Sequence, residues 1–288
     1  MPDRLPPRLK DVGASVRQRL LNLARARGQP MELLLTRYAL ERLLYRLSLS
    51  PHRERFVLKG AMLLATWFDE PYRATRDVDL LSSGDTAEDV LLATFREIIA
   101  VEVDDGVSFD VKGLRIEAIR EEAEYGGSRL RTTAMLAGAR IPTTVDIGFG
   151  DAVEPGVEDI DLPVLLDMPS PHLRAYPPET VIAEKFHAMV VLGRANSRMK
   201  DYYDVWMLVS AFKLDHERLR RAVVATFERR NTKIPAELPD GLRDAFATDR
   251  AKQEQWEAFA SNFASEYPKL SVIVANIRRK LEIFVGST

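Results

Sequence analysis

The sequence contains no cysteine and no long apolar run, and breaker residues are sparse. Its 288 residues include 15 glycines, 16 prolines and no cysteine, which excludes disulfide scaffolds, thiolate metal sites and cysteine nucleophiles. No apolar stretch approaches the ~18 residues that a transmembrane helix needs. The N-terminal segment MPDRLPPRLKD carries charge and proline where a secretion signal would be apolar. We therefore expect a soluble, cytoplasmic protein that does not associate with membranes.

An excess of charge of either sign is also missing. Lys and Arg number 41 against 43 Asp and Glu, a formal net charge of −2. This balance excludes a generally basic nucleic-acid coat and confines any RNA-binding surface to a local patch. Hydrophobic residues make up 46% and charged residues 29% of the chain, which is a globular composition. The length allows one large domain or two ordinary ones.

The first half of the chain mixes helical and extended patterns. Apolar spacing predicts an amphipathic helix at 31–47, and further patterns predict a strand at 56–58, a helix at 61–68, a strand at 77–81, a helix at 90–100 and strands at 130–136 and 143–149. The alternating stretch between 107 and 119 predicts a hairpin that turns at Lys112-Gly113. We expect a mixed sheet here, with an N-terminal helical extension at 1–30 and a core domain at 31–165.

The second half, by contrast, is expected to be helical. Prolines gather between 151 and 177 and indicate a connecting segment or domain boundary. Helices are predicted at 178–192, 199–213, 215–230 and 252–284, within a helical domain at 166–288. The late basic residues are either an RNA track or solvated helix faces. They are Arg218, Arg220, Arg221, Arg229, Arg230, Lys233, Arg278, Arg279 and Lys280.

Three acidic residues on two predicted strands give the strongest chemical signal. Asp77 and Asp79 begin the strand at 77–81, and alternate residues of a strand point to the same face. Asp146 lies between apolar neighbours in a later strand, where a carboxylate needs a cation or a hydrogen bond. Carboxylates suit Mg²⁺ or Mn²⁺ and two-metal phosphoryl transfer. A lone D-x-D pattern is also common on a solvated strand edge.

Residues around this pair are suited to phosphate binding. Gly60 lies where a predicted strand meets a helix, and free backbone N–H groups at such a turn can receive a phosphate. A purely conformational role for this glycine is the alternative. Arg76, next to the acidic pair, is either a solvated charge or a cation facing a triphosphate.

At this point the sequence resembles the polymerase-β-like nucleotidyltransferases, and most closely the AbiEii/AbiGii toxin family, which includes the MenT toxins. The likeness lies in the blocks FVLKGAMLL (56–64), YRATRDVDLL (72–81), TTVDIGFG (143–150), ETVIAEKFHAM (179–189) and SRMKDYYDVWML (197–208). It implies an α+β fold, with a polymerase-β-like nucleotidyltransferase mixed sheet, flanking helices and a helical C-terminal domain that completes the active site.

The resemblance also implies roles for the acidic residues and for one lysine. Asp77 and Asp79 would hold the metals and act in catalysis, and Asp146 would complete the metal cluster. Lys185 would contact the nucleotide phosphates, and Asp204 would orient that lysine. From its helical pattern alone, Lys185 lies at the edge of an apolar stripe, where a surface pair with Glu184 is the alternative.

Further nucleotide-binding positions follow from the same likeness. They are Lys59, Gly60, Thr75, Arg76 and, one helical turn before Asp204, Asp201. For Thr75, a structural role in the turn before the strand is the alternative. A departure concerns the serine that follows the strand-end glycine in the wider superfamily, which is Ala61 here. Backbone groups or Lys59 must then replace its hydroxyl contact.

The function implied is that of a toxin in a toxin–antitoxin system. It would transfer a nucleoside monophosphate from an NTP to RNA, at the 3′ end of tRNA, with Mg²⁺ or Mn²⁺ as cofactor and a cognate antitoxin as partner. Two alternatives stay open, namely transfer to a protein hydroxyl and a non-catalytic nucleotide-binding partner protein. The four histidines show no metal-ligand spacing, so no zinc site is predicted.

Overall fold

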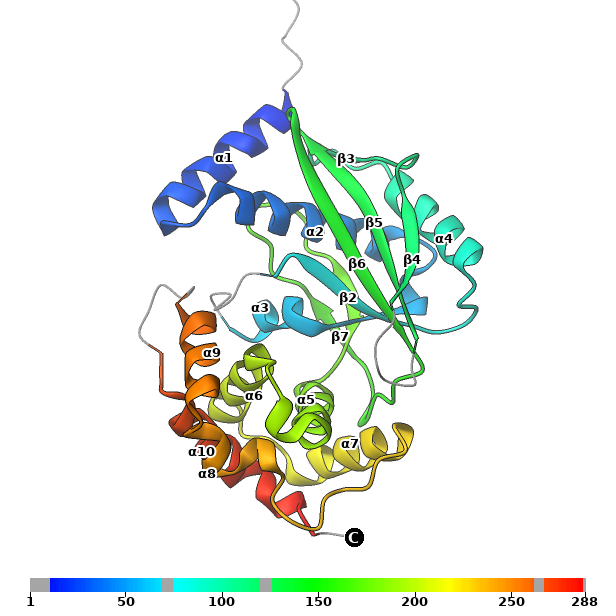
Figure 1. Ribbon diagram of the computed structural model, residues 1–288. Coiled ribbons are helices and arrows are strands. Elements are labelled where there is room, and N and C mark those ends of the chain that lie inside the picture. The colour runs from blue at the N-terminus through cyan, green and yellow to red at the C-terminus, as the bar shows by residue number, and fades with distance from the viewer. Residues whose placement is uncertain (1–10, 69–74, 120–125, 262–266, 287–288) are drawn as a thin grey trace, which may run out of the picture. The chain divides into compact units, whose positions relative to one another are not determined.

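The computed structural model describes residues 11–68, 75–119, 126–261 and 267–286 and divides into two compact units (Figure 1). Unit 1 comprises Met1–Thr66, Ala74–Phe149 and Asp159–Arg174. Unit 2 comprises Trp67–Arg73, Gly150–Glu158 and Ala175–Thr288. Each unit is formed by segments that are separated in the sequence, so its core depends on distant parts of the chain.

A mixed eight-stranded sheet forms the centre of unit 1. Its order is β3-β5-β6-β2-β1-β8-β7, and β4 also pairs with β5. The bounds are β1 (Phe56–Lys59), β2 (Asp77–Ser82), β3 (Val107–Phe109), β4 (Arg115–Ile119), β5 (Gly127–Leu136), β6 (Ala139–Phe149), β7 (Glu158–Asp161) and β8 (His172–Ala175). Strands β2 and β6 run parallel, whereas β1–β2 and β5–β6 are antiparallel. This confirms the predicted mixed sheet.

The two faces of the sheet differ in polarity. Along β5 and β6, buried residues such as Leu130 and Val145 alternate with more exposed ones, because successive side chains of a strand point to opposite faces. Helices α2 (Met31–Leu49) and α4 (Glu88–Ala100) cover the apolar face and lie behind these strands in Figure 1. The opposite face of β2, β4, β5 and β6, which we call the charged face, holds Asp79, Asp146 and Arg129.

Helix α2 also carries charged residues inside the core of unit 1. Arg46 is 2% exposed and forms a two-pronged ion pair with Asp105, with distances of 2.7 Å (Nη1–Oδ2) and 3.1 Å (Nη2–Oδ1). The Glu41 carboxylate accepts from the backbone N–H of Leu165 at 3.0 Å. Burial raises the pKa of Glu41, while Arg37 opposes that shift. These contacts attach α2 to the loop before β3 and to the segment before β8.

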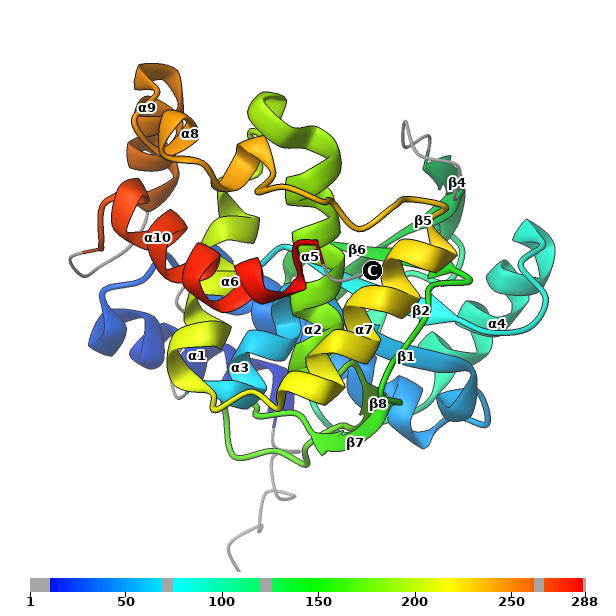
Figure 2. The same ribbon diagram turned by 90° about the horizontal axis from the view of Figure 1, so that it is seen from below.

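Helices make up most of unit 2. They are α5 (Pro178–Leu192), α6 (Met199–Ala211), α7 (His216–Arg229), α8 (Asp244–Ala247), α9 (Arg250–Ala260) and α10 (Leu270–Leu281). Helix α5 packs against α6 and α7, and α10 packs against α6 and α8 (Figure 2). This confirms the predicted helical C-terminal part.

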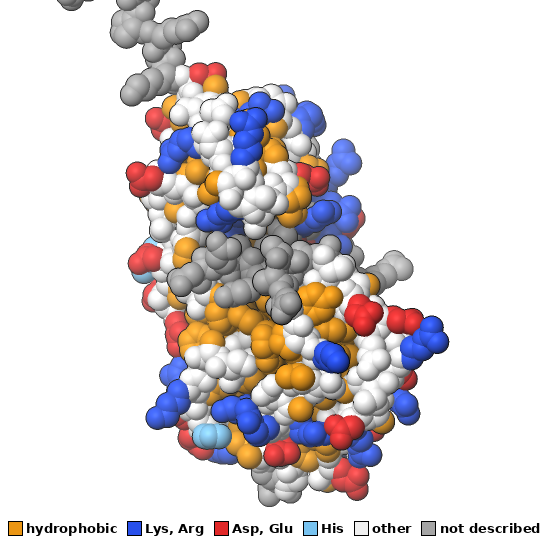
Figure 3. All heavy atoms as spheres, turned by 90° about the vertical axis from the view of Figure 1, so that its left-hand side faces the viewer, with side chains coloured by type: hydrophobic (Ala, Val, Ile, Leu, Met, Phe, Trp, Pro, Cys, Tyr) orange, Lys and Arg blue, Asp and Glu red, His pale blue; other side chains and the backbone are white. Residues whose placement is uncertain are grey.

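Some apolar side chains of unit 2 remain at the surface. Figure 3 shows hydrophobic side chains gathered on one face of the molecule. The exposed large hydrophobic residues of unit 2 include Val191, Leu192, Tyr267, Val272 and Ile283. Such exposure is ordinary, because much of a folded protein's surface is apolar. No helix in the described ranges is long and apolar enough to span a bilayer.

Two predicted elements are wrong. The stretch 107–119 is not a hairpin, because β3 and β4 both pair with the long strand β5, at Val107↔Leu136 and Arg115↔Arg131. The helix expected at 252–284 is two helices, α9 and α10, with Pro268 before the second. Residues 262–266 of that prediction, and residues 1–10 of the N-terminal extension, lie outside the described residues.

Two further boundaries differ from the sequence pattern. Strand β6 begins at Ala139, four residues earlier than expected, because Ala137 and Gly138 form a tight turn with positive φ angles of 44° and 81°. The proline-rich segment 151–177 contains β7 and β8, which extend the sheet. Proline density therefore marked a region of short strands as well as a connection.

Candidate active site

The predicted acidic residues lie in two neighbouring cross-strand rows on the charged face. Asp77 and Asp79 are half-buried at the start of β2. In the parallel pairing of β2 with β6, Asp79 lies opposite Asp146 and Asp77 lies opposite Thr144. Partnered residues of adjacent strands share a face. Asp77, Asp79 and Asp146 consequently lie on the same side of the sheet.

Gly60 adjoins this row from the neighbouring strand. It directly follows β1, where Lys59 lies opposite Asp79. Gly60 has a φ of +74°, and a Cβ at this position would overlap Oδ2 of Asp79. The expected helix at 61–68 is a 3₁₀ turn at Gly60–Leu63 followed by the short α3 (Leu64–Trp67). Close packing against Asp79 thus explains why residue 60 is a glycine. The short helix that follows is not needed for this explanation.

Replacement of Gly60 by alanine is expected to displace Asp79 and to lower the transfer rate at least about tenfold. Two costs combine, since a non-glycine residue at positive φ costs about 1 kcal/mol or more and the new methyl group overlaps a carboxylate. Steady-state transfer rates and thermal unfolding of the variant measure both effects. Gly84→Ala is the matched control, because Gly84 also has a positive φ, of 84°, but has no neighbouring atom within 4 Å of its added Cβ. A fully active Gly60→Ala protein would contradict the packing argument.

Thr75 and Arg76 lead into β2. The Thr75 hydroxyl donates to Oδ1 of Asp77 at 2.8 Å, which fixes the orientation of that carboxylate. Arg76 is exposed and forms no hydrogen bond or ion pair with any described residue. Residues 72–74 of the same block lie outside the described residues. Thr75 is therefore placed to position an acid, and Arg76 is accessible to solutes.

Arg129 on β5 holds Asp146 in a two-pronged contact. Its Nε donates to Oδ1 at 2.7 Å and its Nη2 to Oδ2 at 2.6 Å. The two residues are register partners across β5 and β6. The hydrogen bond to Asp146 raises the pKa of Arg129, and the charges of Asp146, Asp77 and Glu117 act in the same direction. Arg129 is accordingly a permanent positive charge beside the acidic residues.

A divalent cation fits Asp77 and Asp79 better than Asp146. Oxygen ligands on one strand face suit Mg²⁺ or Mn²⁺, and Asp77 and Asp79 are alternate residues of β2. The carboxylate of Asp146 is already balanced by Arg129 through both oxygens. Within the described part of the chain, no group of three His, Asp or Glu side chains is arranged to hold a metal. As the side chains lie here, a role for Asp146 as third ligand requires Arg129 to release one of its oxygens.

A second cluster, in unit 2, surrounds Lys185 of α5. Its Nζ lies 2.6 Å from Oδ1 of Asp201 and 3.0 Å from Oδ2 of Asp204, both on α6. The two aspartate side chains are each 1% exposed and that of Lys185 is 16% exposed. Arg198 forms a further ion pair with Asp201, at 2.8 Å. The structure thus brings Lys185, Asp201 and Asp204 together, and the surface pair with Glu184 is not needed to explain the lysine.

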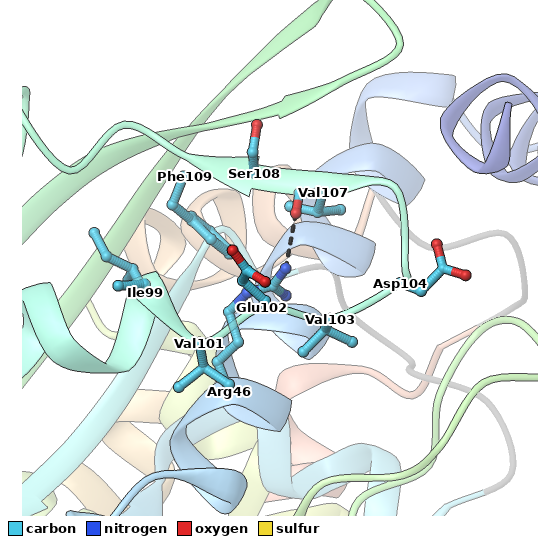
Figure 4. Close-up of a pocket in the computed structure, with 10 residues that line it drawn as sticks. Arg46, Ile99, Val101, Glu102, Val103, Asp104, Val107, Ser108 and Phe109 are labelled. Atoms are coloured by element: carbon cyan, nitrogen blue, oxygen red, sulfur yellow. Dashed lines mark hydrogen bonds between the residues drawn. The ribbon is translucent and has the colours of Figure 1, made fainter.

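A separate cavity of about 520 Å³ lies at the other edge of the sheet (Figure 4). Val101, Val103 and Phe109 line it, together with Arg46, which donates to the Val107 carbonyl at 2.7 Å. Strands β5 and β6 separate β3 from β2 in the sheet. The charge of Arg46 is balanced by Asp105, so we assign the cavity no part in the acidic site.

The sequence analysis did not single out Arg129 or Arg198. Arg129 lies one residue before the strand predicted at 130–136, although the alternation in GSRLRTTAML extends back to it. Arg198 precedes the first turn of α6, and its role as ion-pair partner of the buried Asp201 is visible only in the structure. The alternation of apolar and polar residues could have identified Arg129 as part of the strand, whereas no sequence pattern identified Arg198.

Comparisons with known proteins identify a family for the chain. Residues 42–282 match the family model described as Nucleotidyl transferase AbiEii toxin, Type IV TA system. No curated protein matches the chain. Among solved structures, JHP933 from Helicobacter pylori has 16% identity and a TM-score of 0.46, with coverage of 86% of this chain and 93% of that one. Another H. pylori protein, classed provisionally as a nucleotidyltransferase, has 18% identity, a TM-score of 0.44 and coverage of 86% and 96%.

The family match spans the two clusters described above. It includes Asp77 and Asp79 on β2, Asp146 on β6 and Lys185 on α5. It also extends over strands β1 to β8 and helices α5 to α10. The chain therefore belongs to the AbiEii family of nucleotidyltransferase toxins, whose members act in type IV toxin–antitoxin systems.

Proposed function

We propose that the protein transfers a nucleoside monophosphate from an NTP to RNA, at the 3′ end of tRNA, in a reaction that depends on Mg²⁺ or Mn²⁺. The observation that carries this proposal is the cross-strand row in which Asp79 lies opposite Asp146, with Asp77 on the same face. A modified tRNA 3′ end cannot be aminoacylated, so translation would stop. The reaction draws on NTP and tRNA in the cytoplasm, where we place the protein.

The residues of unit 1 would have distinct roles in such a site. Asp77 and Asp79 would hold the metal, which when bound would lower the pKa of the attacking hydroxyl and neutralise charge on the triphosphate. Thr75 orients Asp77 through its hydroxyl. Gly60 lets the backbone after β1 lie against Asp79. Arg76 and Lys59 supply cations for the phosphates, which develop negative charge as pyrophosphate leaves.

The family resemblance further supports a role for Lys185 in contacting the nucleotide phosphates. Asp201 and Asp204 hold its ammonium group at 2.6 and 3.0 Å. Because these carboxylates are buried, they restrict the lysine to a small set of orientations. Asp204 is thus a positioning residue, and Asp201 shares that role while it also pairs with Arg198.

The acceptor is tested by supplying each labelled NTP in turn, with Mg²⁺, to total tRNA or to cell protein. We expect label on tRNA, preference for one NTP and loss of transfer when the metal is removed with EDTA. Because the carboxylates bind hard cations, Mn²⁺ should restore transfer after EDTA treatment. Label on protein alone would replace RNA with a protein hydroxyl as the acceptor. Absence of label on both would favour a non-catalytic nucleotide-binding protein.

The family also implies a cognate antitoxin. We propose that it is encoded with this chain and that it opposes the toxin's effect on translation. Co-expression of a candidate antitoxin should restore growth of cells that produce the active chain. Cells that produce an Asp79→Asn chain should grow without it.

A further inference from the structure

Two arginines lie opposite each other on the charged face. Arg115 of β4 is the register partner of Arg131 of β5, and both are exposed. Like charges that face each other across two strands are destabilising. Glu117 relieves part of this repulsion through an ion pair with Arg131 at 2.8 Å. Arg115 forms no ion pair with any residue that the structure describes.

This pair lies in line with the acidic residues. Arg131 is the partner of Thr144 on β6, and Thr144 is the partner of Asp77 on β2. Adjacent strands are about 4.8 Å apart. The backbone of Arg131 is therefore about 10 Å from that of Asp77, and the backbone of Arg115 is about 14 Å from it, counting two and three strand spacings along this row. The row therefore has positive charge at Arg115 and Arg131 and negative charge at Asp77, all on one face of the sheet.

One more arginine extends the positive region. Arg129 lies one row further along β5, beside Asp146. Strand β4 contains one acidic residue, Glu117, and β5 contains none. The part of the charged face on β4 and β5 is consequently a local basic patch, which we call the arginine patch, comprising Arg115, Arg129 and Arg131.

Some of the late basic residues are neutralised within unit 2. Four of those highlighted in the sequence form ion pairs with acids. Arg218 pairs with Glu158 and Glu179, Arg220 with Glu217, Arg230 with Asp151 and Glu184, and Arg278 with Asp244. Ion pairs also involve Arg129 and Arg131 of the arginine patch. The patch is the stronger candidate for an RNA track because of its position, since Arg131 and Arg115 lie in the strand row that contains Asp77.

We propose that the arginine patch binds the phosphates of the RNA acceptor strand, with Arg131 and Arg115 as the principal contacts. This inference rests on the proposed function, which places the reacting end of the RNA at Asp77 and Asp79. An acceptor whose terminal hydroxyl lies at these acids would extend its preceding phosphates across β6 towards β5 and β4. Guanidinium groups bind phosphate oxygens through two parallel hydrogen bonds. A polyanion also removes the repulsion between Arg115 and Arg131.

The position of the patch favours RNA over an acidic protein segment. The backbones of Arg131 and Arg115 are about 10 and 14 Å from that of Asp77 along the row, so guanidinium groups follow one another away from the acids, as the successive phosphates of a strand would. An acidic protein segment would have no reason to bind arginines that lie in line with the metal-binding pair Asp77 and Asp79. The alignment therefore favours an RNA whose 3′ end lies at these two acids.

The test is direct binding of fluorescently labelled total tRNA to the full chain without NTP, so that no transfer occurs. We expect Arg115→Gln/Arg131→Gln to lower affinity at least tenfold at about 0.1 M salt. The slope of log K against log salt should become shallower by about 1.4, because each lost single-strand phosphate contact removes about 0.7. In the transfer assay the KM for tRNA should rise, with the KM for NTP and the maximal rate unchanged.

Two matched double variants complete the design. Arg25→Gln/Arg96→Gln removes two exposed arginines from helices of the same unit and should leave tRNA affinity unchanged. Arg220→Gln/Arg221→Gln tests the face of α7. Equal tRNA affinity and salt slope for the Arg115/Arg131 variant and the natural chain would overturn the proposal. So would a loss seen only with the α7 variant, or a loss of antitoxin binding with tRNA binding intact.

The binding readout separates this inference from the proposed function. A chain that binds tRNA through the patch but transfers label only to protein would refute the acceptor and keep the binding surface. A chain that transfers label to tRNA with the same KM in all three double variants would keep the acceptor and refute the patch. Thermal unfolding checks that the Arg115/Arg131 variant is folded, which we expect because exposed ion pairs contribute little to stability.

Discussion

Replacing Asp77 or Asp79 by asparagine is expected to lower nucleotidyl transfer by about 10³-fold or more without unfolding the protein. Asparagine keeps the shape of the side chain but loses the negative charge that a divalent cation needs. Loss of several kcal/mol of metal-dependent stabilisation corresponds to about three powers of ten in rate. Single-turnover transfer of label from NTP to tRNA, at several Mg²⁺ concentrations, measures the effect.

The stability of these variants is expected to change in the opposite direction. Without metal, two carboxylates on one strand face repel each other, so removing one charge relieves repulsion. The amide oxygen in Asp77→Asn can still accept from Thr75, which donates to Asp77 in the natural chain. We expect a melting temperature equal to or above that of the natural protein, measured in EDTA. Asp104→Asn, at an exposed acid before β3, is the control and should retain full activity.

Full transfer activity in both Asp77→Asn and Asp79→Asn would remove the basis of the proposed site. A loss of activity that follows a loss of folded protein would instead assign these residues to structure. The Mg²⁺ titration adds a further distinction, since a weakened metal site should recover some transfer at high Mg²⁺. A variant with an unchanged Mg²⁺ requirement and a reduced rate would place the affected carboxylate outside the metal site.

Replacing Lys185 by methionine is expected to lower both stability and activity. The substitution leaves Asp201 and Asp204 buried at 1% exposure without the ammonium group between them. Breaking a buried ion pair by removing one partner costs about 3–5 kcal/mol. For a protein of this size, such a loss lowers the melting temperature by roughly 6–20 °C. Calorimetry or circular dichroism, alongside the transfer assay, measures the two consequences.

A second substitution separates the two roles of Lys185. Lys185→Met/Asp204→Asn removes one of the stranded carboxylates and should regain part of the lost stability. Transfer should stay low and the KM for NTP should stay high, because the ammonium group of Lys185 no longer faces the nucleotide phosphates. Recovery of transfer together with stability would show that Lys185 acts only in folding. Lys185→Arg, which keeps the charge, is expected to be more stable than Lys185→Met.

The strand pattern around the acids was readable in the sequence because it is local. The strand predicted at 77–81 is observed at Asp77–Ser82, and the alternation of β2 places Asp77 and Asp79 on one face without reference to any other element. The same alternation predicted a strand around Asp146. Helices α5, α6 and α7 begin and end within three residues of their predicted bounds, since each has its own apolar periodicity.

Strand pairing and charge partnership were not readable in this way. The hairpin expected at 107–119 failed because β5 is long enough to pair with β3 and β4 in succession. Arg46 would count as a polar residue on an amphipathic helix, yet it is buried against Asp105, 59 positions away. Partners of this kind depend on contacts between residues far apart in the chain, which local propensity does not record.

The sequence by itself determined the chemical types at the site and the strands and helices that carry them, because periodicity and residue type are local properties. Only the tertiary structure decided that Asp79 lies opposite Asp146, that Arg129 grips Asp146, and that Lys185 joins two buried aspartates. The physical reason is that strand register and the pairing of buried charges are set by packing among distant segments. A carboxylate's role depends on which cation that packing places beside it.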